Sequence, residues 1–150
     1  MSILTTVVTS RGTSEAPRIN YLAILVGSIA AFVIASIYYG VLFSDLWLRV
    51  RRLNPSSVGE VSPSPMQPLI EFGVTLVIAS VIAYLVARLG ITNWKAALRL
   101  ATLLWIAFPG MLWLGAMMWE NTPWQFAALH GGDWLVKCLL FSLIPSVWRR

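Results

Sequence analysis

Three polar residues near the end of the chain carry its strongest signal for chemistry. His130, Asp133 and Lys137 recur at helical spacing, so they would share one face of a helix. Asp133 precedes Lys137 by four residues, the favourable order for an ion pair within a helix. The simpler interpretation is a structural pair whose charges offset each other, with His130 bonded to a neighbour. The functional interpretation is a face that handles protons or ions, because ionisable groups in an apolar segment often mark functional sites.

Two further carboxylates could join this face. Glu71 and Glu120 lie near the ends of other apolar segments, on the side from which the segment containing His130 would enter the membrane. Glu71, Glu120, His130 and Asp133 could therefore converge on one pocket that carries protons or holds a divalent cation. Their spacing matches no known metal-binding motif, so we predict no metal site.

The sequence lacks the common catalytic motifs. It contains no GxSxG or HExxH motif, no phosphate-binding loop and no pair of cysteines. The single histidine limits acid–base chemistry, and haem bound by two histidines would need a second chain. Cys138 is alone in an apolar stretch and is interpreted as a packing residue. We therefore predict no catalytic residues and no cofactor.

The overall composition is typical of a membrane protein. Hydrophobic residues make up 58% of the 150-residue chain and charged residues 11%, against roughly 25% charged in soluble domains. The net charge of +5 comes from residues that flank apolar runs, without a basic patch interleaved with aromatics. This placement indicates contact with membrane lipids and argues against nucleic-acid binding.

Four apolar segments have the length of a membrane span, for which about 20 residues suffice. The fourth is interrupted by the three polar residues and could instead be an amphipathic helix of a soluble protein. A span is favoured because polar residues confined to one face would contact other helices and leave the rest apolar. We predict an all-α, integral membrane four-helix bundle with spans at about residues 19–44, 69–87, 100–119 and 123–148.

The remaining segments define the domain organisation and the topology. Residues 1–18 are predicted to be a flexible polar tail, and 19–150 one domain with a Pro/Ser-rich loop at about 49–68. With four spans, both termini share a side with the loop between spans two and three. That side has seven Lys and Arg residues and the other has three, which predicts cytoplasmic termini.

Small residues at every fourth position mark one face of each of two spans, where two helix backbones could approach closely. These faces are Ala23, Gly27, Ala31 and Ala35 in the first span, and Thr75, Ala79, Ala83 and Ala87 in the second. The alternative is that Ala and Gly are simply common in membrane spans. In the third span, Pro109 interrupts the helical hydrogen bonding and predicts a kink.

Several short stretches resemble a bacterial family of small membrane proteins, the domain of unknown function 1761. They are Ile19-Asn20-Tyr21-Leu22-Ala23, Tyr38-Tyr39-Gly40, Leu42-Phe43, Pro68 to Phe72, Trp119-Glu120, Pro123-Trp124 and His130 to Lys137. The resemblance implies a four-span protein of the bacterial inner membrane and brings no established activity. It draws attention to Glu71, His130, Asp133 and Lys137 without giving them a role.

Three classes of function fit these features. The first is a non-enzymatic accessory subunit that packs through its small-residue faces against other membrane subunits or copies of itself. The second is a small oligomeric carrier or channel that uses the polar face of the fourth span. The third, an enzyme acting on a lipid or quinone, lacks a nucleophile and an acid–base pair. We favour the accessory subunit, with the carrier or channel as the alternative.

Overall fold

The computed structural model describes residues 19–53 and 66–148, and these residues form helices without a single strand. Four of the helical segments are long and apolar enough to cross a membrane: Tyr21–Leu42, Met66–Arg88, Trp94–Trp119 and Trp124–Val147. The predicted all-α four-helix membrane bundle is therefore confirmed. The predicted tail at 1–18 lies outside the described residues.

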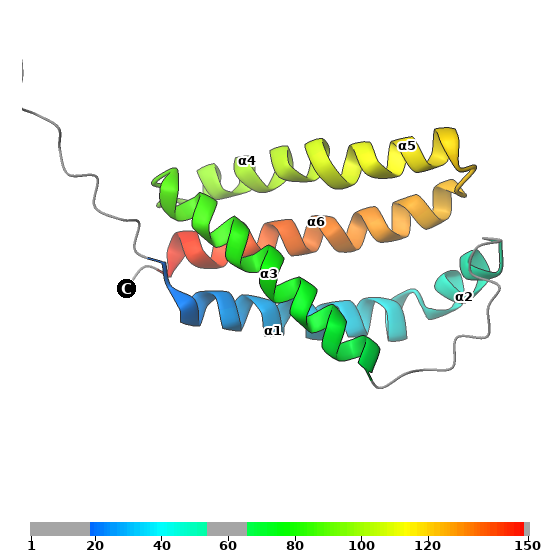
Figure 1. The fold of residues 1–150 in the computed structure, drawn as a ribbon, viewed down its shortest axis with the longest axis horizontal. Helices are drawn as coiled ribbons and strands as arrows, with labels where there is room; N and C mark the ends of the chain where they lie inside the picture. The colour runs from blue at the N-terminus through cyan, green and yellow to red at the C-terminus, as the bar shows by residue number, and fades with distance from the viewer. Residues whose placement is uncertain (1–18, 54–65, 149–150) are drawn as a thin grey trace, which may run out of the picture.

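Figure 1 shows the four spans running alternately in opposite directions along the long axis of the bundle. The helices and π-helical segments, in chain order, are α1 (Tyr21–Ile37), η1 (Tyr38–Leu42), α2 (Ser44–Leu53), α3 (Met66–Arg88), α4 (Trp94–Trp105), η3 (Ile106–Gly110), α5 (Met111–Trp119) and α6 (Trp124–Val147). α1 continues through η1 as the first span, and α4, η3 and α5 together form the third.

The segment predicted as a loop at 49–68 is partly helical, because α2 continues to Leu53 and α3 begins at Met66. α2 alternates apolar residues with Arg49, Arg51 and Arg52, a pattern typical of a helix lying at a membrane surface. Pro68 falls in the first turn of α3, where a missing N–H is tolerated. The loop predicted from the density of prolines is therefore too long at both ends.

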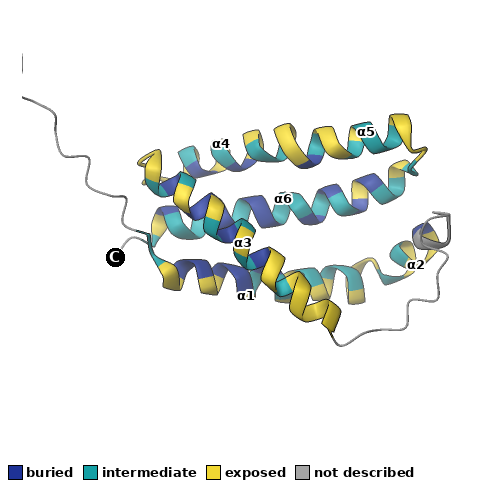
Figure 2. Ribbon diagram, viewed as in Figure 1, coloured by how far each residue is buried: buried dark blue, intermediate teal, exposed yellow. Residues whose placement is uncertain are grey.

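α6 is the central helix and packs against α1, α2, α3, α4 and α5. In its most apolar window 44% of the residues are buried, against 11% for the span formed by α4 and α5. Buried positions recur along α6 in Figure 2, whereas the outer surfaces of α3 and α4 are exposed. The least hydrophobic span is thus the most enclosed by protein, because its polar residues face other helices.

The two small-residue faces lie inside the bundle, where Ala23, Ala31, Ala79 and Ala83 are each at most 3% exposed. On α1, a Cβ added at Gly27 would lie 3.7 Å from side-chain atoms of Phe141 and Ile144 of α6. Larger residues on these faces would hold the helices apart. Thr75 is also buried, whereas Ala35 and Ala87 at the outer ends are half-buried.

The start of the first span is joined to the end of the last. The Asn20 side chain accepts a hydrogen bond from the backbone N–H of Ala23, capping α1, and donates another to the carbonyl of Trp148. The connection at 89–93 between α3 and α4 lies at the same end of the bundle (Figure 1). The opposite end carries α2 and the connection into α6.

Two spans contain a π-helical turn. In η3, Pro109 has no N–H to donate, and a Cβ on the following Gly110 would lie 3.1 Å from the carbonyl oxygen of Trp105. Pro109 was expected to bend this span. The chain accommodates this proline by widening one helical turn. The other π-helical turn, η1, holds two consecutive tyrosines that face α6, and its position is important for the site described next.

Candidate functional site

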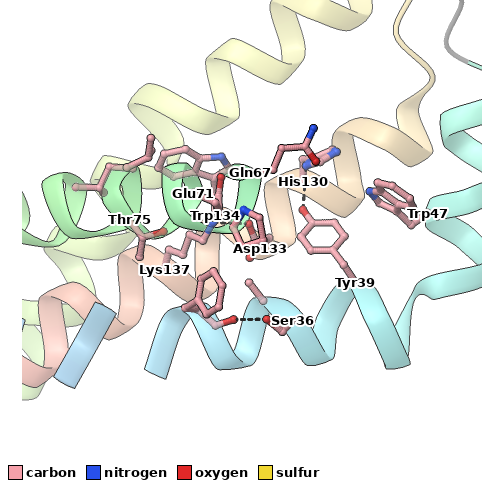
Figure 3. Close-up of a pocket in the computed structure, with 15 residues that line it drawn as sticks. Ser36, Tyr39, Trp47, Gln67, Glu71, Thr75, His130, Asp133, Trp134 and Lys137 are labelled. Atoms are coloured by element: carbon pink, nitrogen blue, oxygen red, sulfur yellow. Dashed lines mark hydrogen bonds and ion pairs between the residues drawn. The ribbon is translucent and has the colours of Figure 1, made fainter. Parts of the chain in front are cut away.

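A cavity of about 670 Å³ lies between α1, α2, α3 and α6, toward the end of the bundle that carries α2. Trp47 of α2 and Gln67 of α3 line it at that end, and Phe32, Thr75 and Ile78 line it further along the spans. Figure 3 shows polar side chains from α3 and α6 gathered on one side of it. The charged residues of its lining are Glu71, Asp133 and Lys137.

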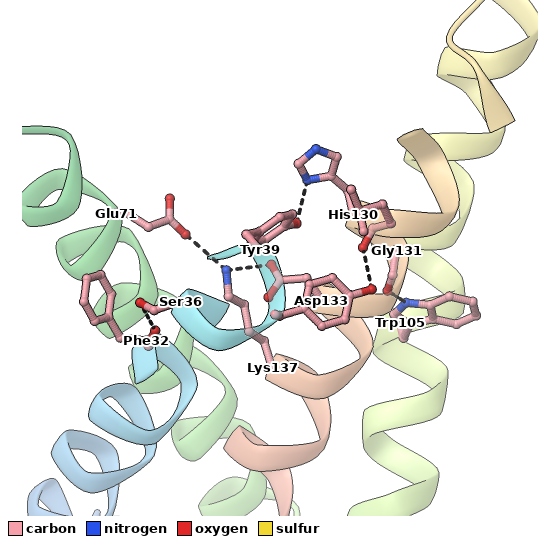
Figure 4. A network of polar contacts seen from close by, with 11 residues as sticks. Phe32, Ser36, Tyr39, Glu71, Trp105, His130, Gly131, Asp133 and Lys137 are labelled. Carbon is pink, nitrogen blue, oxygen red and sulfur yellow. Dashed lines mark hydrogen bonds and ion pairs between the residues drawn. The ribbon is translucent and has the colours of Figure 1, made fainter. Parts of the chain in front are cut away.

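Lys137 bridges two carboxylates that come from different helices. Its ammonium nitrogen lies 3.0 Å from Asp133 Oδ2 and 3.1 Å from Glu71 Oε1, as Figure 4 shows. The Asp133 contact is the i, i+4 pair predicted from sequence, whereas the Glu71 contact links α6 to α3. Removing either kind of charge from water is costly, so each stabilises the other in this setting.

The three charged groups differ in exposure. The side chains of Lys137 and Asp133 are each 8% exposed, whereas that of Glu71 is 55% exposed. The Lys137 ammonium also lies 5.7 Å from the ring centroid of Trp134. Asp133 and Lys137 are therefore a fixed buried pair, and Glu71 is the carboxylate that a molecule in the cavity can reach.

His130 lies one turn before Asp133 in a setting made almost entirely of aromatic rings. Its ring stacks on Trp113 with centroids 5.2 Å apart, and Phe126 approaches to 4.3 Å. Its Nδ1 lies 2.9 Å from the Tyr39 hydroxyl, which donates to it when that nitrogen carries no proton. Its Nε2 is buried without a hydrogen-bond partner in the described part of the chain. These contacts fix the imidazole at the edge of the cavity.

Two further hydrogen bonds reach backbone carbonyls of α6 from neighbouring helices. The Tyr38 hydroxyl donates to the Leu129 carbonyl at 3.0 Å, and the Trp105 indole donates to the Gly131 carbonyl at 2.7 Å. A Cβ on Gly132 would lie 2.6 Å from the Tyr38 hydroxyl oxygen, so only glycine admits this contact. The Gly131-Gly132 pair thus lets polar side chains approach α6 beside His130 and Asp133.

The structure places the predicted polar residues in two groups. Glu71, His130, Asp133 and Lys137 all line the cavity, and the ion pairs join three of them. Glu120 does not line it, because it caps α5, which packs on the side of α6 away from α1 and α3, and its side chain is exposed. Among the described residues, no group of three or more His, Cys, Asp and Glu could hold a metal ion.

Several residues of the site were not singled out by the sequence. Tyr39 lies near the end of the first span and Trp47 just beyond it, positions typical of headgroup aromatics, yet both line the cavity. Trp113 contacts His130 from a different span, more than a dozen residues away in sequence. The sequence feature that could have pointed to these contacts is the Gly131-Gly132 pair between His130 and Asp133, because consecutive glycines indicate the close approach of another group.

The buried pair yields a prediction on stability. Asp133→Leu removes the enclosed partner of the buried Lys137 ammonium and leaves it only the more exposed Glu71, so it should lower the free energy of unfolding by about 3 kcal/mol. The double change Asp133→Leu with Lys137→Leu removes both buried charges and should recover most of that loss. Unfolding in mixed micelles, followed by circular dichroism, measures both, with Glu120→Leu as an exposed control. Equal destabilisation by the single and double variants would contradict this account.

Comparison with known proteins agrees with the resemblance noted in the sequence. The family model described as "Protein of unknown function (DUF1761)" matches residues 22–145, which include every residue of the ion-pair network. No curated protein and no solved structure matches the chain. The family match covers most of the sequence and all four spans in whole or in large part. The chain therefore belongs to the DUF1761 family.

Proposed function

We propose that the protein is a non-enzymatic carrier of the bacterial inner membrane that exchanges a monovalent cation for a proton at Glu71. The observation that carries the proposal is the charge imbalance among the described residues that line the cavity. Two carboxylates, Glu71 and Asp133, share one ammonium, Lys137. When all three groups are ionised, the network has one negative charge too many.

An uncompensated charge is costly in a membrane-spanning segment, where little water is present to solvate it. The network becomes neutral when one carboxylate binds a proton, and it also becomes neutral when a second cation enters the cavity. The two states exclude each other, because binding both would leave a net positive charge. A site of this kind takes up one cation as it releases one proton.

Glu71 is the group suited to this exchange. Asp133 is held against Lys137 and almost fully enclosed, whereas Glu71 lines the cavity and more than half of its side chain is exposed. In the described part of the chain, the titratable groups that line the cavity together with Glu71 are Lys137, Asp133 and His130 from α6 and Tyr39 from η1. Of these, Lys137 alone carries a permanent positive charge, and it is already shared with Asp133.

The exchange can be measured in proteoliposomes that contain a pH-sensitive dye. A monovalent cation added outside should drive protons out of vesicles that contain the wild-type protein. Glu71→Gln should abolish this movement, because the amide can neither release a proton nor attract a cation. Glu120→Gln, the same substitution outside the cavity, should exchange at the wild-type rate. Proton movement that persists in Glu71→Gln would overturn the proposal.

The accessory-subunit hypothesis relied on small-residue faces that would dock against a partner. Most residues of those faces are buried within this chain, with Ala35 and Ala87 half-buried, so their burial favours packing inside the bundle. A chain of 16.7 kDa is small for a complete solute pathway, and we propose that several copies act together. Native mass measurement after gentle detergent extraction should give a homo-oligomer. A complex with a different protein would favour the accessory role instead.

We further propose that both termini are cytoplasmic, so that the cavity lies nearer the outer surface. The excess of Lys and Arg at the end with the termini supports this orientation. In a Cys138→Ser background, Glu120→Cys should react with a membrane-impermeant maleimide in intact cells. Thr92→Cys, in the connection at the other end, should react only after lysis. The reverse labelling pattern would contradict the orientation.

A further inference from the structure

We infer that the cation accepted by the cavity is an organic ammonium ion with an apolar substituent, not an alkali metal ion. The inference rests on the proposed exchange at Glu71 and names its substrate class. Three features of the cavity lead to it: its size, its aromatic lining, and the separation of its charged and apolar surfaces.

The first feature is size. Water occupies about 30 Å³ per molecule in the liquid, so about 670 Å³ is the space of roughly twenty waters. Cavities that enclose organic ligands typically measure about 300–1,000 Å³. An alkali ion would need only a small part of this space and a ring of oxygen ligands around it. The volume therefore fits an organic molecule of moderate size.

The second feature is the aromatic lining. Phe32, Tyr39, Trp47 and Trp134 line the cavity and come from four different elements. Aromatic faces attract ammonium groups, and tryptophan does so most strongly. The cavity already contains one instance, since the Lys137 ammonium lies 5.7 Å from the Trp134 ring centroid. A ligand ammonium would therefore meet surroundings that already stabilise this kind of charge.

The third feature is the separation of charge from apolar surface. Val74 and Ile78 follow Glu71 by three and seven residues on α3, so they continue the same helix face further into the membrane. Both line the cavity, and Phe32 lines it from α1. An ammonium group at Glu71 would thus place an attached apolar group against Val74, Ile78 and Phe32. An inorganic ion would leave that surface without contacts.

The test uses calorimetric titration of the full-length protein in nanodiscs. Benzyltrimethylammonium should bind with release of a proton to the buffer, whereas K⁺ and the neutral benzyl alcohol should bind at least tenfold more weakly. Trp134→Leu keeps an apolar side chain but removes the ring beside the ion-pair network, and it should weaken benzyltrimethylammonium binding about fivefold. Trp119→Leu, an exposed tryptophan outside the cavity, serves as the matched control.

The possible results distinguish a failure of the inferred substrate class from a failure of the exchange proposal on which it rests. Binding of K⁺ as tight as that of benzyltrimethylammonium, with a proton released, overturns the substrate class and leaves the exchange proposal standing. Benzyltrimethylammonium binding that survives Glu71→Gln reflects partition into the lipid and overturns the inference. If no cation releases a proton from the wild-type protein, both fail. Circular dichroism of Trp134→Leu checks the fold, and a weakened affinity in a folded variant supports the aromatic contact.

Discussion

A lysine ammonium buried within a membrane span requires opposite charges close to it, and much of this bundle is arranged around that requirement. Lys137 lies just beyond the midpoint of α6, where lipid cannot solvate it. Its own helix supplies Asp133 one turn away, and α3 supplies Glu71. The second contact requires α3 to pass α6 at this level. The position of α3 is therefore tied to an electrostatic contact as well as to apolar packing.

The same helix arrangement explains why one half of the bundle is tight and the other is open. Toward the termini, Ile24, Ala79, Ile82 and Phe141 belong to a core in which α1, α3 and α6 are in close contact. Small residues permit this approach, since helices in lipid associate mainly through packing. Toward α2, α3 crosses the bundle obliquely (Figure 1), and the cavity lies at this end between α1, α2, α3 and α6.

The central position of α6 offsets its low hydrophobicity. Neighbouring helices cover its polar face, and its two consecutive glycines let Tyr38 and Trp105 donate hydrogen bonds to its backbone. Because every neighbour packs on this one helix, a change at Asp133 or Lys137 would reach α3, α1 and the cavity together. Structure and proposed function thus depend on the same few side chains.

The sequence by itself determined the spans, the helical class, the family and the Asp133–Lys137 pair, because apolar length and i, i+4 spacing are local properties. It could not determine that Glu71 joins this pair and Glu120 does not, since that depends on which side of α6 each helix packs. The tertiary structure alone decided that the small-residue faces are internal and that Tyr39 and Trp47 line a cavity. Contacts between distant segments depend on how helices cross, and no spacing within one helix encodes that crossing.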